Sequence, residues 1–283
     1  MAGRRGAVGR YGVGPLGAFD RDTAVRPLGA GRYAAEVHDA WFVLRGANGG
    51  YVAAIVLKAL TAELADPARH PRSLTIHYTA PPQAGLAEVA VTIERAGRSA
   101  STLSARLTQG DRLVALALAT FAAGFPDALD FDAAAMPDVP PPDEVPPMPD
   151  SRERPTFMSN LDMRPALGPP AFSGAQTAHG GGWMRLREPH VLDASVVTAY
   201  ADMWYPAPFV RLTTVAAAPT IDLTIHFRRP LPPGPDTQGA FVLGDFHSRL
   251  SRDGFFEEDG VIFSQDGGLL AQSRQLALLL PLA

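Results

Sequence analysis

PTIDLTIHFRRPLPP, residues 219–233, has a shorter copy in the same chain, RSLTIHYTAPP, at residues 72–82. The shared LTIH aligns without a gap, and the prolines that follow also align, while Ser73 of the first copy falls opposite Asp222 of the second. Apolar and polar residues alternate with a period of two in both copies, which predicts a strand with one buried face.

The duplication extends beyond this strand. Residues 107–121 and 263–280 also match, so the chain repeats with a period of roughly 150 residues. In these alignments Asp222 falls on Ser73 and Gln275 falls on Ala119. The acid and the amide therefore occur together only in the second copy.

Composition limits the class of protein. With 283 residues, 46% of them hydrophobic and 19% charged, the chain can fold as two ordinary globular domains. A net charge of -4 and the lack of a Lys/Arg run argue against nucleic-acid and membrane partners. We expect residues 1–20 to form a flexible N-terminal tail. The chain has no cysteine and this tail lacks a signal-peptide stretch, so we also expect a cytoplasmic protein.

A buried helix followed by strands is predicted in each half. Asn48-Gly49-Gly50 precedes residues 51–64, which are apolar on nearly every side, as in a helix enclosed by protein. Four short antiparallel strands follow, and the second half repeats the pattern with a helix over 194–205. A proline-rich linker, 131–152, then separates an N-terminal domain, 21–130, from a C-terminal domain, 153–283.

A long helix wrapped by an antiparallel sheet, twice in one chain, resembles the α+β double hotdog fold. More specifically, the chain resembles the type II acyl-CoA thioesterases and their thioesterase-like relatives. The matching segments are ANGGY at 47–51, TID at 220–222, HF followed by Pro230, DG and LA within 266–271, and SRQ at 273–275. This resemblance implies hydrolysis of an acyl-CoA to a free fatty acid and coenzyme A.

The resemblance also implies that an Asp, a Gln and a Thr or Ser hold the attacking water. Carried over by motif, Asp222 is the general base, and Gln275 and Ser248 orient the water; His247 or Ser251 could replace Ser248. Backbone N–H groups of Gly49 and Gly50, at the start of the buried helix, are the expected oxyanion or substrate-binding donors. The reaction implies no redox cofactor, and no metal-binding motif is apparent.

Other functions compete with this interpretation. The main alternative is a non-catalytic acyl-CoA or acyl-carrier binding protein of the same fold, and an enoyl-CoA hydratase ranks last. The segment HGGG at 179–182 resembles an esterase oxyanion motif, but no G-x-S-x-G nucleophile elbow accompanies it, so we predict a tight turn there. Acyl chain length and homo-oligomer formation stay open.

Overall fold

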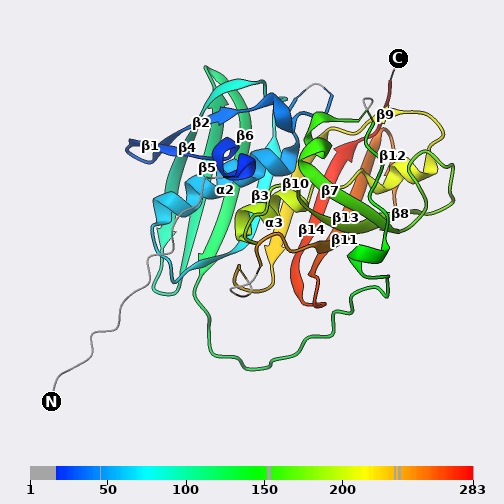
Figure 1. Ribbon diagram of the computed structural model, residues 1–283. Helices are drawn as coiled ribbons and strands as arrows, with labels where there is room; N and C mark the ends of the chain where they lie inside the picture. Colours follow the sequence, from blue (N-terminus) through cyan, green and yellow to red (C-terminus); the bar gives the residue numbers. More distant parts are fainter. Residues whose placement is uncertain (1–16, 45, 152–153, 233, 235–236, 283) are drawn as a thin grey trace.

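The computed structural model describes residues 17–44, 46–151, 154–232, 234 and 237–282. Figure 1 shows helices α2 (Gly49–Leu64) and α3 (Ala194–Tyr200) lying on one face of a sheet that runs through both halves of the chain. The helices are α1 (Ala18–Asp22), α2 (Gly49–Leu64) and α3 (Ala194–Tyr200), with 3-10 turns η1 (Asp39–Trp41), η2 (Pro142–Glu144), η3 (Thr156–Asn160) and η4 (Ala207–Arg211).

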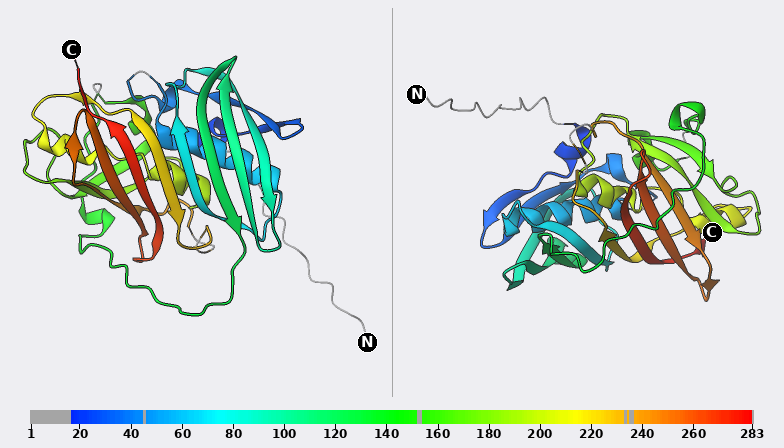
Figure 2. Two further views of the ribbon diagram at one scale, coloured as in Figure 1. Left: turned by 180° about the vertical axis from the view of Figure 1, so that it is seen from behind. Right: turned by 90° about the horizontal axis from the view of Figure 1, so that it is seen from below.

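The strands of the first half are β1 (Arg26–Gly29), β2 (Arg32–Val37), β3 (His70–Tyr78), β4 (Gly85–Ala96), β5 (Ala100–Gln109) and β6 (Arg112–Ala122). Those of the second half are β7 (Leu161–Leu167), β8 (Ala178–Leu186), β9 (Ala216–Ala217), β10 (Thr220–Phe227), β11 (Val242–Ser248), β12 (Ser251–Arg252), β13 (Phe255–Ser264), β14 (Leu269–Leu278) and β15 (Leu280–Pro281). The main sheet has the order β1-β2-β4-β5-β6-β3-β10-β14-β13-β11-β8-β7, with β12 paired to β13. Seen from behind, its strands pass without a break from one half to the other (Figure 2).

The two copies of the repeated segment form the centre of this sheet. β3 and β10 pair antiparallel, with Thr75 opposite Thr224 and their hydroxyl oxygens 3.0 Å apart. Thr75 and Thr224 are also the residues that align with each other in the repeat. The halves are therefore related by an approximate two-fold axis through this pair. The double hotdog prediction is confirmed.

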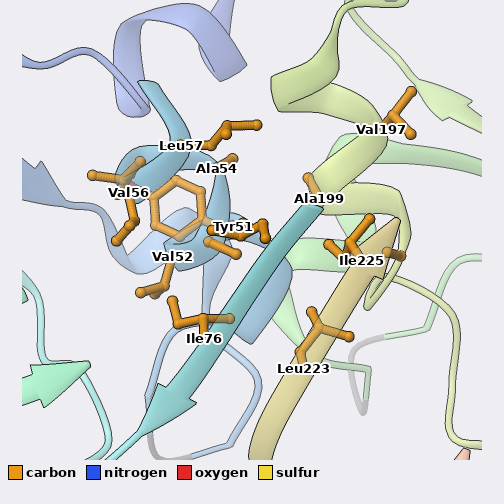
Figure 3. Packing of buried hydrophobic residues seen from close by; sticks show 14 of the residues in the cluster. Tyr51, Val52, Ala54, Val56, Leu57, Ile76, Val197, Ala199, Leu223 and Ile225 are labelled. Atoms are coloured by element: carbon orange, nitrogen blue, oxygen red, sulfur yellow. The ribbon is translucent and has the colours of Figure 1, made fainter. Parts of the chain in front are cut away.

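Helix α2 is enclosed because its side chains are apolar on every face of the first turns. Asn48 caps it, with Oδ1 accepting a hydrogen bond of 3.0 Å from the Tyr51 N–H. Its side chains pack against the inner face of β3 and against α3 of the other half, as Figure 3 shows. A Cβ at Gly50 would lie only 2.4 Å from the Ala199 carbonyl oxygen, so glycine permits this close approach of the helices.

Several predicted boundaries shift. The second helix ends at Tyr200 rather than at residue 205, and the HGGG segment lies inside β8 rather than in a turn. Residues 1–16 of the predicted tail lie outside the described residues, but Phe19 is buried, so the folded part begins by Ala18. No described helix has the length and hydropathy needed to cross a bilayer.

The proline-rich linker runs along the outside of the second half. Between residues 131 and 151, all of them described, it forms no strand and only the short turn η2. Met136, Val139 and Val145 pack against Trp183 and Leu243, on the face of the sheet that points away from the helices. The linker therefore covers part of the outer face of the sheet in the second half.

Candidate active site

Gln275 lies on the inner face of the sheet, beneath the helices. It is opposite Leu223 in the β10–β14 pair, and directly paired residues share a face, so the buried Leu223 defines its direction. The side chain is 6% exposed. Its Oε1 accepts a hydrogen bond of 2.9 Å from the Thr220 hydroxyl. The structure thus places Gln275 in a polar group inside an otherwise apolar layer.

Asp222 does not lie in this group. It is opposite Leu276 on β14 and His77 on β3, positions adjacent to inward-facing residues, so its side chain points to the outer face. A register shift between Thr220 and Asp222 brings Thr220 to the inner face, opposite Ala277. The expectation that Asp222 shares a water with Gln275 is corrected, because the sheet separates their side chains.

Ser248 is also separate from Gln275. It ends β11, which is two strands away from β14, a separation of about 9.6 Å at ordinary strand spacing. The intervening strand, β13, contributes Glu258, which reaches Gln275 instead. The two alternatives to Ser248 fare no better, since His247 faces outward and Ser251 is exposed on β12.

Asp202 occupies the place that the sequence analysis gave to Asp222. It lies two residues after the end of α3, against the first turn of α2. Its Oδ2 accepts hydrogen bonds from the Gly50 N–H at 2.9 Å and from Asn48 Nδ2 at 3.3 Å. The Thr220 hydroxyl is 3.4 Å from Oδ1. Asp202, Thr220 and Gln275 therefore meet at the N-terminus of a helix from the other half.

Two acids near this point have raised pKa values. Asp202 as a residue is half-buried, but its carboxyl is surrounded by protein, and desolvation raises its pKa to about 6 despite the hydrogen bonds from Gly50 and Thr220. Burial raises the pKa of Glu258 to about 8, against hydrogen bonds from Ala207 and Gln275. Glu258 is thus protonated near neutral pH, whereas Asp202 is mostly ionised.

Glu258 fixes the orientation of the Gln275 amide. Gln275 Nε2 donates to Glu258 Oε1 at 2.7 Å, while the amide oxygen on the other side accepts from Thr220. The second carboxyl oxygen of Glu258 accepts from the Ala207 N–H, which ties it to the segment after α3. Hydrogen-bond partners at both ends therefore hold the Gln275 side chain in place.

Gly49 and Gly50 lie at the site but not as free donors. The N–H groups of Gly49 and Gly50 both donate to the Asp202 carboxylate, and the Tyr51 N–H is used by the helix cap. A Cβ at Gly49 would lie 2.8 Å from Asp202 Oδ2, so the absent side chain leaves room for the carboxylate. The two glycines thus bring the positive end of α2 close to Asp202.

Asp202, Thr220 and Glu258 were not among the site residues predicted from the sequence. Thr220 is part of the quoted TID segment, and only the register shift shows that it, rather than Asp222, faces inward. Nothing in the sequence near Asp202 sets it apart from other acids. Glu258 occupies an inward position of an alternating strand, where a buried acid is a signal that could have been noticed.

Comparison with known proteins identifies the family. Residues 37–122 match the acyl-CoA thioesterase N-terminal domain, and residues 140–279 match the acyl-CoA thioesterase C-terminal domain. The chain belongs to the acyl-CoA thioesterase family. This thioesterase is therefore a thioester hydrolase, and the family recognised from the sequence is confirmed.

Solved structures share the fold over nearly the whole chain. This thioesterase is 27% identical to a hot dog fold protein of unknown function from Alicyclobacillus acidocaldarius, covering 95% of this chain and 100% of that one with a TM-score of 0.85. A putative thioesterase II from Thermobifida fusca is 25% identical, with coverages of 95% and 99% and a TM-score of 0.79. The acyl-CoA thioesterase II TesB2 from Mycobacterium marinum, at 22% identity, coverages of 93% and 99% and a TM-score of 0.73, shows the same fold. No curated protein matches the chain significantly.

Proposed function

We propose that this thioesterase hydrolyses an acyl-CoA to a free fatty acid and coenzyme A with a water molecule held by Asp202, Thr220 and Gln275. The observation that carries the proposal is the meeting of these three side chains, with Thr220 Oγ1 2.9 Å from Gln275 and 3.4 Å from Asp202. They are an acid, a hydroxyl and an amide, the residue types that the family resemblance implies. Asp202 and Thr220 take the roles first given to Asp222 and Ser248.

Asp202 acts as the general base. A carboxylate with a pKa of about 6 is ionised at neutral pH and can still accept a proton from water as the water attacks the thioester carbonyl. A carbon–oxygen bond forms, the carbon–sulfur bond then breaks, and the proton passes from Asp202 to the leaving thiolate of coenzyme A. Water is consumed and no cofactor is required.

Thr220 and Gln275 position the water. The Gln275 amide is held by Glu258, so its orientation is set before the substrate arrives, which lowers the entropic cost of reaction. The N-terminus of α2 lies beside the group, and its partial positive charge favours the negative charge that develops on the carbonyl oxygen. Gly49 and Gly50 contribute by bringing this helix end close to Asp202.

Thiol release from a panel of short to long acyl-CoAs tests the proposal, with Asp202→Asn as the variant and Asp222→Asn as the matched control. The amide introduced by Asp202→Asn can turn its oxygen to the Gly50 N–H and its NH2 group to Thr220, so the fold is kept while the base is lost. We expect kcat to fall about 100-fold or more in Asp202→Asn, the range for a general base, and to change little in Asp222→Asn.

The reverse pattern, with activity lost in Asp222→Asn and kept in Asp202→Asn, would overturn the assignment. Equilibrium binding of the same acyl-CoAs separates a further outcome. If the wild type binds them but releases no thiol from any, the protein is the non-catalytic acyl-CoA binding protein considered above. The panel also identifies the preferred acyl chain length.

A further inference from the structure

Three metal-ligating side chains meet on the outer face of the second half, away from the site above. His179 Nε2 and His247 Nε2 lie 2.9 Å and 3.0 Å from the same oxygen, Asp245 Oδ1. All the ligand atoms of this group lie within 4.8 Å of one another. His179 and Asp245 are 66 residues apart in the chain, so only the fold brings them together.

Two adjacent strands hold these side chains in place. His179 on β8 is directly opposite His247 on β11, and Asp245, two residues earlier, shares the face of His247. The residue opposite Asp245 is Gly181, where a Cβ would lie 2.2 Å from the Gly244 carbonyl oxygen, so glycine lets the two strands approach closely here. Phe246, between Asp245 and His247, points into the core on the opposite face. The donors are therefore built on paired strands rather than on a loop.

Two arrangements account for the convergence of these three atoms. Either both imidazoles donate an Nε2–H to the one carboxylate oxygen, or their lone pairs and the carboxylate share a cation. The rings stack with centroids 4.0 Å apart and an angle of 8° between planes. This stacking brings both Nε2 atoms to the same carboxylate oxygen, so one ion can contact all three ligand atoms.

We propose that His179, Asp245 and His247 bind a divalent transition-metal ion, with Zn²⁺ the best suited. Two imidazoles and one carboxylate are ligands that Zn²⁺ accepts, whereas Mg²⁺ and Ca²⁺ prefer sites made of oxygen alone. Metal–ligand bonds of about 2.0–2.1 Å place tetrahedral donors about 3.3 Å apart, so small side-chain rotations suffice. The side chains are 28%, 16% and 41% exposed in chain order, which leaves access for the ion and for water as a fourth ligand.

The nearest other carboxylate on this face does not join the three ligands. Asp259 on β13 lies opposite His247 on the same outer face, but its carboxylate already pairs with Arg249 and Arg274. The bound ion would join β8 to β11 from outside and stabilise the second half. It would not take part in hydrolysis, because Asp202, Thr220 and Gln275 lie on the inner side of the sheet.

Calorimetric titration of the full chain with ZnCl2, and with MgCl2 as a contrast, tests this site. The variants are His179→Gln, His247→Gln and Asp245→Asn, and the matched control is His226→Gln, an exposed histidine of β10 outside the group. We expect about one Zn²⁺ per chain in the wild type and in the control, with affinity at least 10-fold weaker in each ligand variant. Zn²⁺ should raise the Tm of the wild type and of the control but not that of the ligand variants. Mg²⁺ should raise the Tm of none of them.

Zn²⁺ affinity in Asp245→Asn and His247→Gln equal to that of the wild type would overturn the proposal, as would a wild type that binds no Zn²⁺. The group would then be a hydrogen-bonded His–Asp–His cluster. If a ligand variant fails to fold, the visible absorption of Co²⁺ added to the wild type still tests the site. Ligation by imidazole and carboxylate changes the Co²⁺ spectrum from that of the hydrated ion. Excess Zn²⁺ should reverse this change by displacing Co²⁺. An unchanged Co²⁺ spectrum would also refute the site.

Discussion

Burial and hydrogen bonding shift the pKa of Asp202 in opposite directions. Burial favours the neutral acid, while the Gly50 N–H and the Thr220 hydroxyl favour the carboxylate, and the balance raises the pKa to about 6. A carboxylate in a wholly aqueous setting would be a weaker base. The hydrogen bonds from the first turn of α2 keep Asp202 ionised at neutral pH in spite of its enclosure.

The pH dependence of thiol release should reflect this pKa. Because the base must be ionised, kcat/KM should be low when Asp202 is protonated and should rise as pH increases through about 6. Initial rates between pH 4.5 and 8 measure the profile. The same rise in Asp202→Asn, at reduced activity, would mean that another group controls it.

Glu258 gives a stability prediction of definite sign. Its pKa is raised from 4.5 to about 8, so between these values the folded protein holds a proton that the unfolded chain releases. This contribution to stability is complete below pH 4.5 and is lost as pH rises through about 8, with a slope of at most about 1.4 kcal/mol per pH unit.

Glu258→Gln removes this titration, so the stability difference between variant and wild type should move in favour of the variant by at least about 1 kcal/mol from pH 5 to pH 9. Urea unfolding at pH 5, 7 and 9 measures the difference. Asp202 titrates in both proteins, and its effect largely cancels. Parallel stability curves across this range would show that Glu258 is not held neutral.

At the scale of elements, the close contact between α2 and α3 depends on a single glycine. Gly50→Ala would place a methyl group 2.4 Å from the Ala199 carbonyl oxygen, and backbone atoms on neither side can move easily. We expect a loss of about 2 kcal/mol or more in the free energy of unfolding, and lower activity because Asp202 binds the same turn.

Gly124→Ala is the matched control for this prediction, because a Cβ at that exposed position meets nothing within 4 Å. Its unfolding free energy should stay within about 0.5 kcal/mol of the wild type. Denaturant unfolding of both variants gives the comparison. Equal stability of Gly50→Ala and Gly124→Ala would mean that the helices can separate without cost.

The β10 strand shows how one irregularity decides which side chains form a site. The alternation of β10 already places the Asp222 side chain on the outward face, so this orientation could be predicted from the sequence. Strict alternation would put Thr220 on the same outward face as Asp222. The register shift after Thr220 turns its hydroxyl inward instead. Strand existence could be predicted from the sequence, but the shift depends on pairing with β14 and is not a local property.

At the scale of the whole molecule, the halves share one core. The largest buried cluster combines α2 and β3 of the first half with α3 and β10 of the second, and β3 and β10 are joined through backbone pairing. Calorimetry should therefore show one unfolding transition, with the calorimetric and van't Hoff enthalpies nearly equal. Two resolved transitions would indicate that the halves are independently stable.

Local patterns in the chain were enough to predict the duplication and the enclosed helix, and the resemblance of its motifs to a known family predicted the double hotdog fold and the acyl-CoA thioesterase family. A strand with one buried face alternates, a helix enclosed on all sides is apolar throughout, and a repeat is visible in the letters. The same patterns singled out Gln275 as a polar residue in an apolar strand, although the catalytic role of Gln275 stays a prediction.

Which polar groups meet could be seen only in the folded chain. Asp202 reaches the N-terminus of α2 through packing of one half against the other, and His179 reaches Asp245 and His247 through the pairing of β8 with β11. The physical reason is that a site depends on distances between residues remote in the chain. Those distances are set by strand register, a bulge and helix contact, which involve many residues at once and leave no mark on any single segment.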